Sequence, residues 1–355
     1  MIAIIEFFRI VAFCAIFLHH LSYKGSLGVI AVSAFFVITG FVSANSLIKF
    51  KTINIGMLSE YYLSRAIRLY PVHFLTFIIS LPVVAVKSSP FDTIANLLLL
   101  HNWYPSGIQI FSHNSVSWFI SDIVFFSILT PFILNFLTHN KIHKSVTKLL
   151  LIKLILFGTA VFITLEFRGV LKAYSFGWWF IYASPYFRLV DYMLGLMAGI
   201  IFINLKQIMI PNIKNKKVIF TILELLSLIL FISIYKMPYF KYQSIVMSIY
   251  YTPAIIIIVT IFSFQQGIVS SALNIKLFTN IGKLTFSAFL THQVVFRYAQ
   301  KIIPSIYNIP SGQNNICVQF VLFLFVMIIS AVIYRYYELP IKRLFNKHYV
   351  SRSNL

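Results

Sequence analysis

The stretch FFRIVAFCAIFLHHLS, residues 7–22, is an almost continuous apolar run with Arg9 near its start and His19 and His20 near its end. Comparable apolar runs recur along the chain at lengths of about 20 residues, the length that an α-helix needs to cross a bilayer core. Strands of a membrane β-barrel would instead alternate apolar and polar residues over about ten residues, and these runs do not alternate. We therefore predict an all-α, polytopic bundle of transmembrane helices.

The composition excludes a water-soluble domain. Of the 355 residues, 59% are hydrophobic and only 10% are charged, whereas soluble domains carry about 25% charged residues. The net charge of +21 does not indicate a nucleic-acid partner, because most basic residues fall in short loops between the apolar runs, where they set orientation. The expected surroundings are the lipid bilayer. The first run lacks a small-residue cleavage site, so we expect a retained span rather than a signal peptide.

About ten transmembrane spans are expected from the apolar runs. They cover residues 4–22, 27–47, 69–87, 116–137, 149–166, 184–204, 217–235, 245–264, 284–302 and 315–335. Lysine and arginine are concentrated in alternate loops and in the C-terminal tail, so the positive-inside rule predicts that both termini are cytoplasmic. Residues 88–115 and 174–187 are too polar or too broken to span, and we expect interfacial or re-entrant segments there.

We predict one membrane domain, residues 1–338, followed by a short basic cytoplasmic tail, residues 339–355. The segment YRYYELPIKRLF contains Glu338 and Pro340 and is interpreted as the end of the last helix rather than as a site. The two cysteines, Cys14 and Cys317, both lie in apolar segments. They predict neither a disulfide framework nor a metal site.

Arg9 and His20 lie on one face of the first predicted helix. Eleven residues correspond to about 1,100° of rotation, which leaves an offset of only about 20° over a rise of about 16 Å. His19 is displaced by about 80° in the opposite direction. The shared face predicts a cavity that contains Arg9 and His20, and imidazole is a base near neutral pH. The alternative is that Arg9 and the two histidines merely mark the two ends of the span.

Arg65 and Arg68 are adjacent on one helical surface because they are three residues apart, just before Pro71. Two guanidinium groups suit a phosphate or pyrophosphate, since each donates two hydrogen bonds in a fork. The alternative is a positively charged anchor at a helix entrance. Taken alone, the pair of arginines favours that alternative.

Three further groups of residues lie in the predicted spans. Two of them are ionisable, and ionisable groups at membrane depth usually face the bundle interior. Asp122, in an otherwise apolar span, either orients a histidine or cation or forms a structural ion pair. Arg188 and Asp191 are expected to pair. Gly195 and Gly199, four residues apart, predict close packing of two helices.

Together and in this order, these features resemble the membrane acyltransferase-3 family. The matching segments are Arg9 with His20, FFVITGF at residues 35–41, Arg65 and Arg68 before Pro71, GKLTFSAFLTH at residues 282–292, and Glu338 to Pro340. Two positions depart from the family pattern. Thr39 replaces the usual serine, and Ser121 replaces the arginine that precedes Asp122 in one branch of the family.

The resemblance implies transfer of an acyl group, usually acetyl, from cytoplasmic acetyl-CoA to a hydroxyl of a surface carbohydrate, without a metal. It implies catalytic roles for His20, Arg9 and Asp122, and donor binding by Arg65 and Arg68. His20 either deprotonates the acceptor directly or carries the acetyl group. We expect a bacterial inner-membrane protein whose acceptor is a lipid-linked or surface polysaccharide such as the O-antigen of lipopolysaccharide, without the fused hydrolase-like domain of some relatives.

The alternative function is that of a transporter or flippase for a lipid-linked sugar, which would make no bond. Inverted-repeat transporters tend to show corresponding short or Gly/Pro-broken spans in two halves. The sequence shows no such pair, so the enzyme is favoured.

Overall fold

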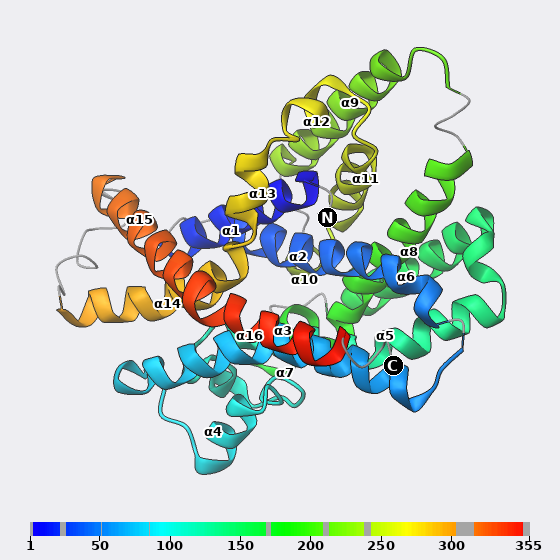
Figure 1. Ribbon diagram of the computed structural model, residues 1–355. Helices are drawn as coiled ribbons and strands as arrows, with labels where there is room; N and C mark the ends of the chain where they lie inside the picture. The colour runs from blue at the N-terminus through cyan, green and yellow to red at the C-terminus, as the bar shows by residue number, and fades with distance from the viewer. Residues whose placement is uncertain are drawn as a thin grey trace.

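A computed structural model gives the structure of the chain and describes residues 3–21, 26–50, 52–84, 86–167, 172–208, 213–237, 243–302 and 316–350. The structure is 84% helical and has no strand in these ranges. The prediction of an all-α helical bundle is thus confirmed (Figure 1).

Nine helices of the described ranges are long and apolar enough to cross a membrane. They are built from α1 (Ala3–His20), α2 (Leu27–Ser43) with η1 (Ala44–Phe50), α3 (Ile55–Ser80) with η2 (Leu81–Val83), α5 (Ser117–His139), α6 (Val146–Glu166), α7 (Phe176–Trp178) with η5 (Trp179–Ala183) and α8 (Pro185–Ile208), α9 (Lys216–Lys236), α10 (Gln243–Ser248) with α11 (Thr252–Ser263), and α15 (Ile316–Ile333) with η8 (Tyr334–Glu338) and α16 (Leu339–Val350). The shorter elements are α4 (Pro90–Leu97), η3 (Gly107–Phe111), η4 (Ile142–Lys144), α12 (Ile268–Ala272) and α13 (Lys276–Gly282).

The ninth expected span, residues 284–302, corresponds to α14 (Thr285–Ile302), which contacts α1, α3 and α15. It is more polar than the other nine because it carries His292, Arg297 and Lys301 among its 18 residues. His292 is buried and Arg297 is partly buried, whereas Lys301 is exposed at the end of the helix, so α14 lacks the hydropathy of a lipid-facing span.

Two expected helix boundaries are wrong. The third span begins at Ile55 rather than at residue 69. The Asn54 side chain caps this start of the helix by accepting a hydrogen bond from the Met57 amide at 2.8 Å. Arg65 and Arg68 consequently lie inside α3 and not at its entrance. The last helix does not end at Glu338, because a π-helical turn continues into α16. Pro340, which has no amide hydrogen to donate, lies just after that turn.

The centre of the bundle is a close contact between α2 and α8. A Cβ added to Gly195 would lie 2.2 Å from the Val37 carbonyl oxygen, and one added to Gly199 would lie 2.4 Å from that of Phe41. Gly40 of α2 makes the matching close approach to α8, since a Cβ added to Gly40 would lie 2.0 Å from the Tyr192 carbonyl oxygen. The predicted role of Gly195 and Gly199 in close helix packing is confirmed.

Arg188 and Asp191 also pair as expected, in the buried part of α8. The guanidinium donates to the Asp191 carboxylate at 2.9 Å and to the backbone carbonyls of Met247 and Ser248. Thr252 donates a further hydrogen bond to Asp191 at 2.7 Å. The ion pair therefore attaches α8 to α10 and α11.

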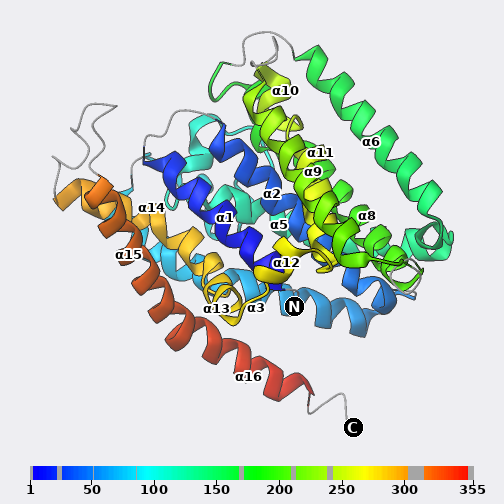
Figure 2. The same ribbon diagram turned by 90° about the horizontal axis from the view of Figure 1, so that it is seen from above.

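The two ends of the bundle differ. Figure 2 shows the start of α1, α13 and α16 at one end, which we call the terminal side, and α10 at the other. The second end also carries α4, η3, α7 and the residues between them, because they connect the far ends of α3, α5 and α8. We call this end the loop side.

We expect Gly195→Ala to lower the free energy of unfolding by about 1–3 kcal/mol, because the added methyl group overpacks the contact with the Val37 backbone. The matched control is Gly158→Ala in α6, where an added Cβ meets nothing within 4 Å. Detergent-titration unfolding of both variants measures the difference. Equal stability of the two would show that the α2–α8 contact does not require glycine.

Candidate active site

A charged cavity of about 380 Å³ lies on the terminal side, enclosed by α1, α2, α3, α5, α13, α14, η8 and α16. Its wall contains five cations and two carboxylates, namely Arg9, Arg65, Arg68, Lys283, Lys342, Glu6 and Glu338. An adjoining cavity of about 620 Å³ shares Arg65, Arg68 and Lys342 with it. The cations outnumber the carboxylates, so the wall suits an anionic ligand.

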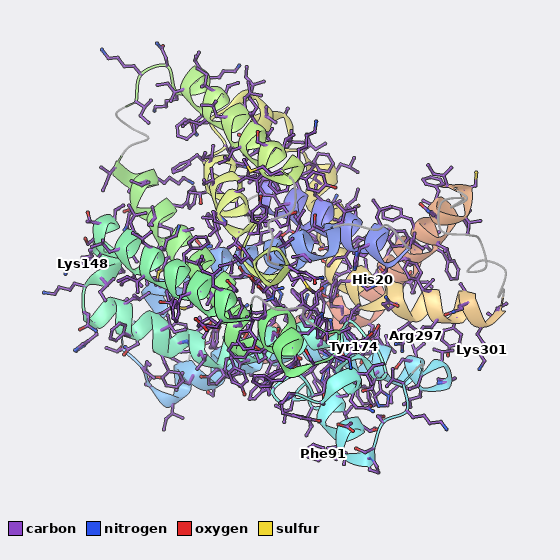
Figure 3. All side chains as sticks on the ribbon, turned by 180° about the vertical axis from the view of Figure 1, so that it is seen from behind. His20, Phe91, Lys148, Tyr174, Arg297 and Lys301 are labelled. Atoms are coloured by element: carbon purple, nitrogen blue, oxygen red, sulfur yellow. The ribbon has the colours of Figure 1, made fainter. Side chains whose placement is uncertain are left out.

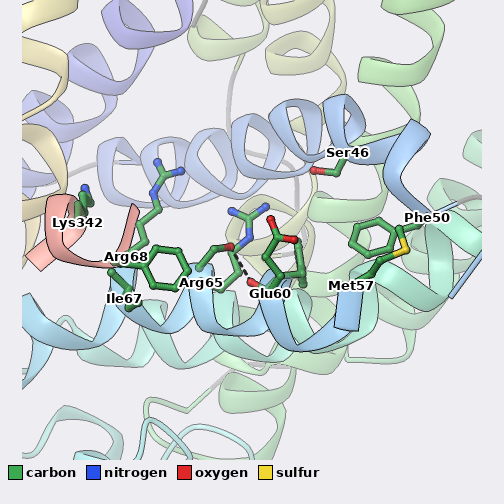
Figure 4. A pocket seen from close by; sticks show the side chains of 11 residues that line it. Ser46, Phe50, Met57, Glu60, Arg65, Ile67, Arg68 and Lys342 are labelled. Carbon is green, nitrogen blue, oxygen red and sulfur yellow. Dashed lines mark hydrogen bonds between the residues drawn. The ribbon is translucent and has the colours of Figure 1, made fainter. Parts of the chain in front are cut away.

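Arg65 and Arg68 are brought to this wall by α3. Figure 4 shows both side chains pointing away from the axis of α3, with Lys342 of α16 nearby. The Arg65 guanidinium lies over the ring of Tyr61, 5.0 Å from its centroid. Within the described ranges, neither guanidinium has a hydrogen-bond or ion-pair partner. Their donor forks are therefore available to a ligand.

The two carboxylates of the cavity are both paired with a neighbouring cation. Glu6 accepts from Arg9 at 2.7 Å, and Glu338 accepts from Ser287 at 2.7 Å and from Lys342. The sequence did not predict that Glu6, Glu338 and Lys342 line this cavity. The four-residue spacing of Glu338 and Lys342 would have indicated a salt bridge if the helix had been expected to continue.

His20 lies at the other end of α1, remote from the N-terminus of the chain (Figure 3). Its ring centroid is 5.2 Å from that of His292 in α14. In the sequence His292 stands out only as the end of the motif GKLTFSAFLTH, and its proximity to His20 was not predicted. No local signal predicts it, because the two residues come from opposite ends of the chain.

The tautomer of His292 is fixed by its backbone. His292 is fully buried, and its Nδ1 lies 2.6 Å from the Phe289 carbonyl oxygen. Since a carbonyl can only accept, Nδ1 carries the proton and Nε2 of the neutral ring carries a lone pair. Nε2 has no hydrogen-bond partner in the described part of the chain. It is a buried acceptor beside His20.

His19 and His20 occupy different surroundings, as the helix period predicts. His19 lies against Gly28 of α2, where an added Cβ would be 2.6 Å from the imidazole ring. His20 does not line the cavity that contains Arg9. The structure therefore does not place Arg9 and His20 in one cavity, since Arg9 lines the charged cavity on the terminal side and His20 lies outside it, at the other end of α1.

Asp122 is buried near the start of α5 and is not beside the other predicted site residues. Its Oδ1 accepts from Asn102 at 2.7 Å, and Asn102 also donates to the Ala183 carbonyl at 2.6 Å. Asp122 lines neither charged cavity and has no salt bridge within the described ranges. In this position it joins α5 to the loop side.

The loop side packs directly onto the turn of α14 that carries His292. Asn114 donates to the Leu290 carbonyl at 2.8 Å. His101 contacts the Ser117 hydroxyl at 3.3 Å, and burial, with smaller contributions from neighbouring histidines, lowers the pKa of His101 to about 3. His101 is therefore neutral at pH 7, and the loop-side group that contacts α14 next to His292 is the uncharged side chain of Asn114.

The acyltransferase-domain family matches residues 2–335, which is nearly the whole chain. The chain therefore belongs to the membrane acyltransferase-3 family, as the sequence motifs indicated, and it is a multi-pass membrane acyltransferase. No curated protein and no solved structure matches the chain.

We expect His20→Ala to abolish acyl transfer with a normal level of folded protein, because it removes an imidazole from the pair. His19→Ala should keep most of the activity, because His19 packs against Gly28 of α2 and is not on the helix face that carries Arg9. Acyl transfer and membrane protein level are measured for both variants. An inactive His19→Ala beside an active His20→Ala would contradict the assignment.

Proposed function

We propose that the protein transfers an acetyl group from cytoplasmic acetyl-CoA to a hydroxyl of a cell-surface polysaccharide, such as O-antigen, in a bacterial inner membrane. The observation that carries this proposal is the cationic cavity, in which Arg65 and Arg68 leave their donor forks unused. The family membership supplies the acyl-transfer chemistry.

The donor is proposed to enter from the terminal side. Coenzyme A is anionic at its phosphates, and the paired guanidinium groups of Arg65 and Arg68 suit such oxygens because each donates in a planar fork. Lys342 and Lys283 add charge to the same wall. Arg9, held by Glu6 at 2.7 Å, is the cation proposed to orient the thioester and to stabilise the developing oxyanion.

The transfer itself joins the acceptor oxygen to the acetyl carbon and releases the coenzyme A thiol. An alcohol is a poor nucleophile at neutral pH and needs a base, and His20 is proposed for that role. It takes the hydroxyl proton either in one direct step or after it has carried the acetyl group. The buried Nε2 lone pair of His292, 5.2 Å away between ring centroids, is proposed to support His20 as a fixed neutral neighbour.

The transporter alternative is tested directly by radiolabelled acetyl-CoA given to membranes with candidate glycan acceptors. Label on the glycan supports the transferase. Translocation of glycan without label supports a flippase and contradicts the proposal.

We expect reporter fusions at residues 55 and 145 to be cytoplasmic and a fusion at residue 100 to be external. Residue 55 begins α3 and residue 145 directly precedes α6, both on the terminal side, whereas residue 100 lies on the loop side. The lysine-rich loops favour this orientation. An external reporter at residue 145 would place the donor cavity on the wrong side for cytoplasmic coenzyme A.

We expect the double variant Arg65→Lys, Arg68→Lys to bind acetyl-CoA at least about tenfold more weakly, because it keeps the charge and loses the planar fork. Arg335→Lys is the matched control, since Arg335 is exposed and outside both cavities. Donor affinity and protein orientation are measured for each. If the double variant binds acetyl-CoA as tightly as the wild type, the two arginines do not bind the donor phosphates, and the alternative role of a positively charged membrane anchor is supported.

A further inference from the structure

Three phenylalanine rings close the inner end of the charged cavity. Phe35, Phe119 and Phe289 come from α2, α5 and α14, and on each helix the phenylalanine is the cavity-lining residue farthest from the terminal side. Their ring centroids are 5.8 Å, 5.9 Å and 5.0 Å apart for the pairs 35–119, 35–289 and 119–289. We call these three residues the phenyl triad.

The imidazole pair lies directly behind the phenyl triad. The ring centroid of Phe289 is 5.8 Å from that of His292, and that of His292 is 5.2 Å from that of His20. Phe13 of α1 covers His292 from another side at 6.0 Å. The triad therefore stands between the charged wall, with Arg9, and His20.

The cavity has a polarity gradient along its length. Charged groups of α1, α3 and α16 line the terminal side, and the triad, with Ile120 and Ile123 of α5, lines the inner end. An acyl-CoA has the same gradient, because its phosphates are anionic and its acyl end is apolar. Phosphates bound near Arg65 and Arg68 would direct the acyl end towards the three rings.

We infer that the phenyl triad is the acyl-binding end of the donor site, selects a short acyl group by its size, and separates the donor from the imidazole pair until a ring moves. The inference rests on the proposed function, because it assumes an acyl-CoA donor. Apolar pockets discriminate chain length by the fit of each methylene, typically by tenfold or more. Rotation of a side chain between rotamers is the movement required to open the path.

The experiment compares acetyl-, propionyl-, butyryl- and hexanoyl-CoA as donors for the wild type, Phe119→Ala and Phe289→Ala in membranes. Removing a phenyl ring enlarges the inner end, so the ratio of butyryl to acetyl transfer should rise by about tenfold or more. Thioester hydrolysis without an acceptor is measured in parallel. It should also increase, because the shortened side chains no longer separate the donor from the loop side.

A matched control removes a phenyl ring elsewhere. Phe126→Ala, also in α5, loses a buried ring that packs on Phe36 and Tyr192 and does not line the cavity. This variant should keep the wild-type ratio of butyryl to acetyl transfer. If alanine at the triad prevents folding, Phe119→Leu and Phe289→Leu replace it and should shift the ratio in the same direction.

The outcomes separate the two levels of inference. A wild type that transfers no acyl group from any of the donors contradicts the proposed function. A wild type that transfers acetyl, with triad variants that keep its chain-length ratio, contradicts the role of the triad and leaves the proposed function standing. An equal shift in Phe126→Ala would also overturn the inference, because the effect would then come from general loosening of the bundle.

Discussion

The backbone contact between α2 and α8 determines the rotation of α2, and the candidate site depends on that rotation. Glycines at 40, 195 and 199 bring the two helices so close that Val37 and Phe41 must face α8. With 3.6 residues per turn, Phe35 and Thr39 then fall on the opposite face, where both line the charged cavity. Bulkier side chains between the two helices would hold α2 farther from α8 and would displace the face of α2 that lines the cavity.

Some charged side chains of the bundle have hydrogen-bond and ion-pair partners, and others have none in the described ranges. Arg188 and Asp191 have partners on three helices, so their desolvation is compensated and their role is architectural. Arg65 and Arg68 have no such partner in the described ranges, although a charge in a membrane protein is costly without one. Asp122 is intermediate, since Oδ1 is bound by Asn102 and Oδ2 has no partner among the described residues. This contrast distinguishes a ligand site from a structural ion pair.

The sequence predicted the helices that face lipid and the local spacings within them. Apolar run length predicted the spans, and the four-residue spacing of Gly195 and Gly199 predicted the close packing. It did not predict the first half of α3, because a helix that lines a polar cavity lacks the continuous apolar run of a lipid-facing span. Nor did it predict the contacts of Glu338 with Ser287, 51 residues apart, or of His20 with His292. Such pairs follow from how helices are arranged in space, and no periodicity within one helix encodes them.

The wall of the charged cavity has a consequence for biosynthesis. Glu6 and Arg9 leave the ribosome first, whereas Gly282, Glu338 and Lys342, which complete the same wall, leave it near the end. A partly translated chain therefore has α1 in the membrane without the residues that enclose the cavity. The growing protein cannot assemble this cavity, and so cannot consume thioester through it, before its last helices are inserted.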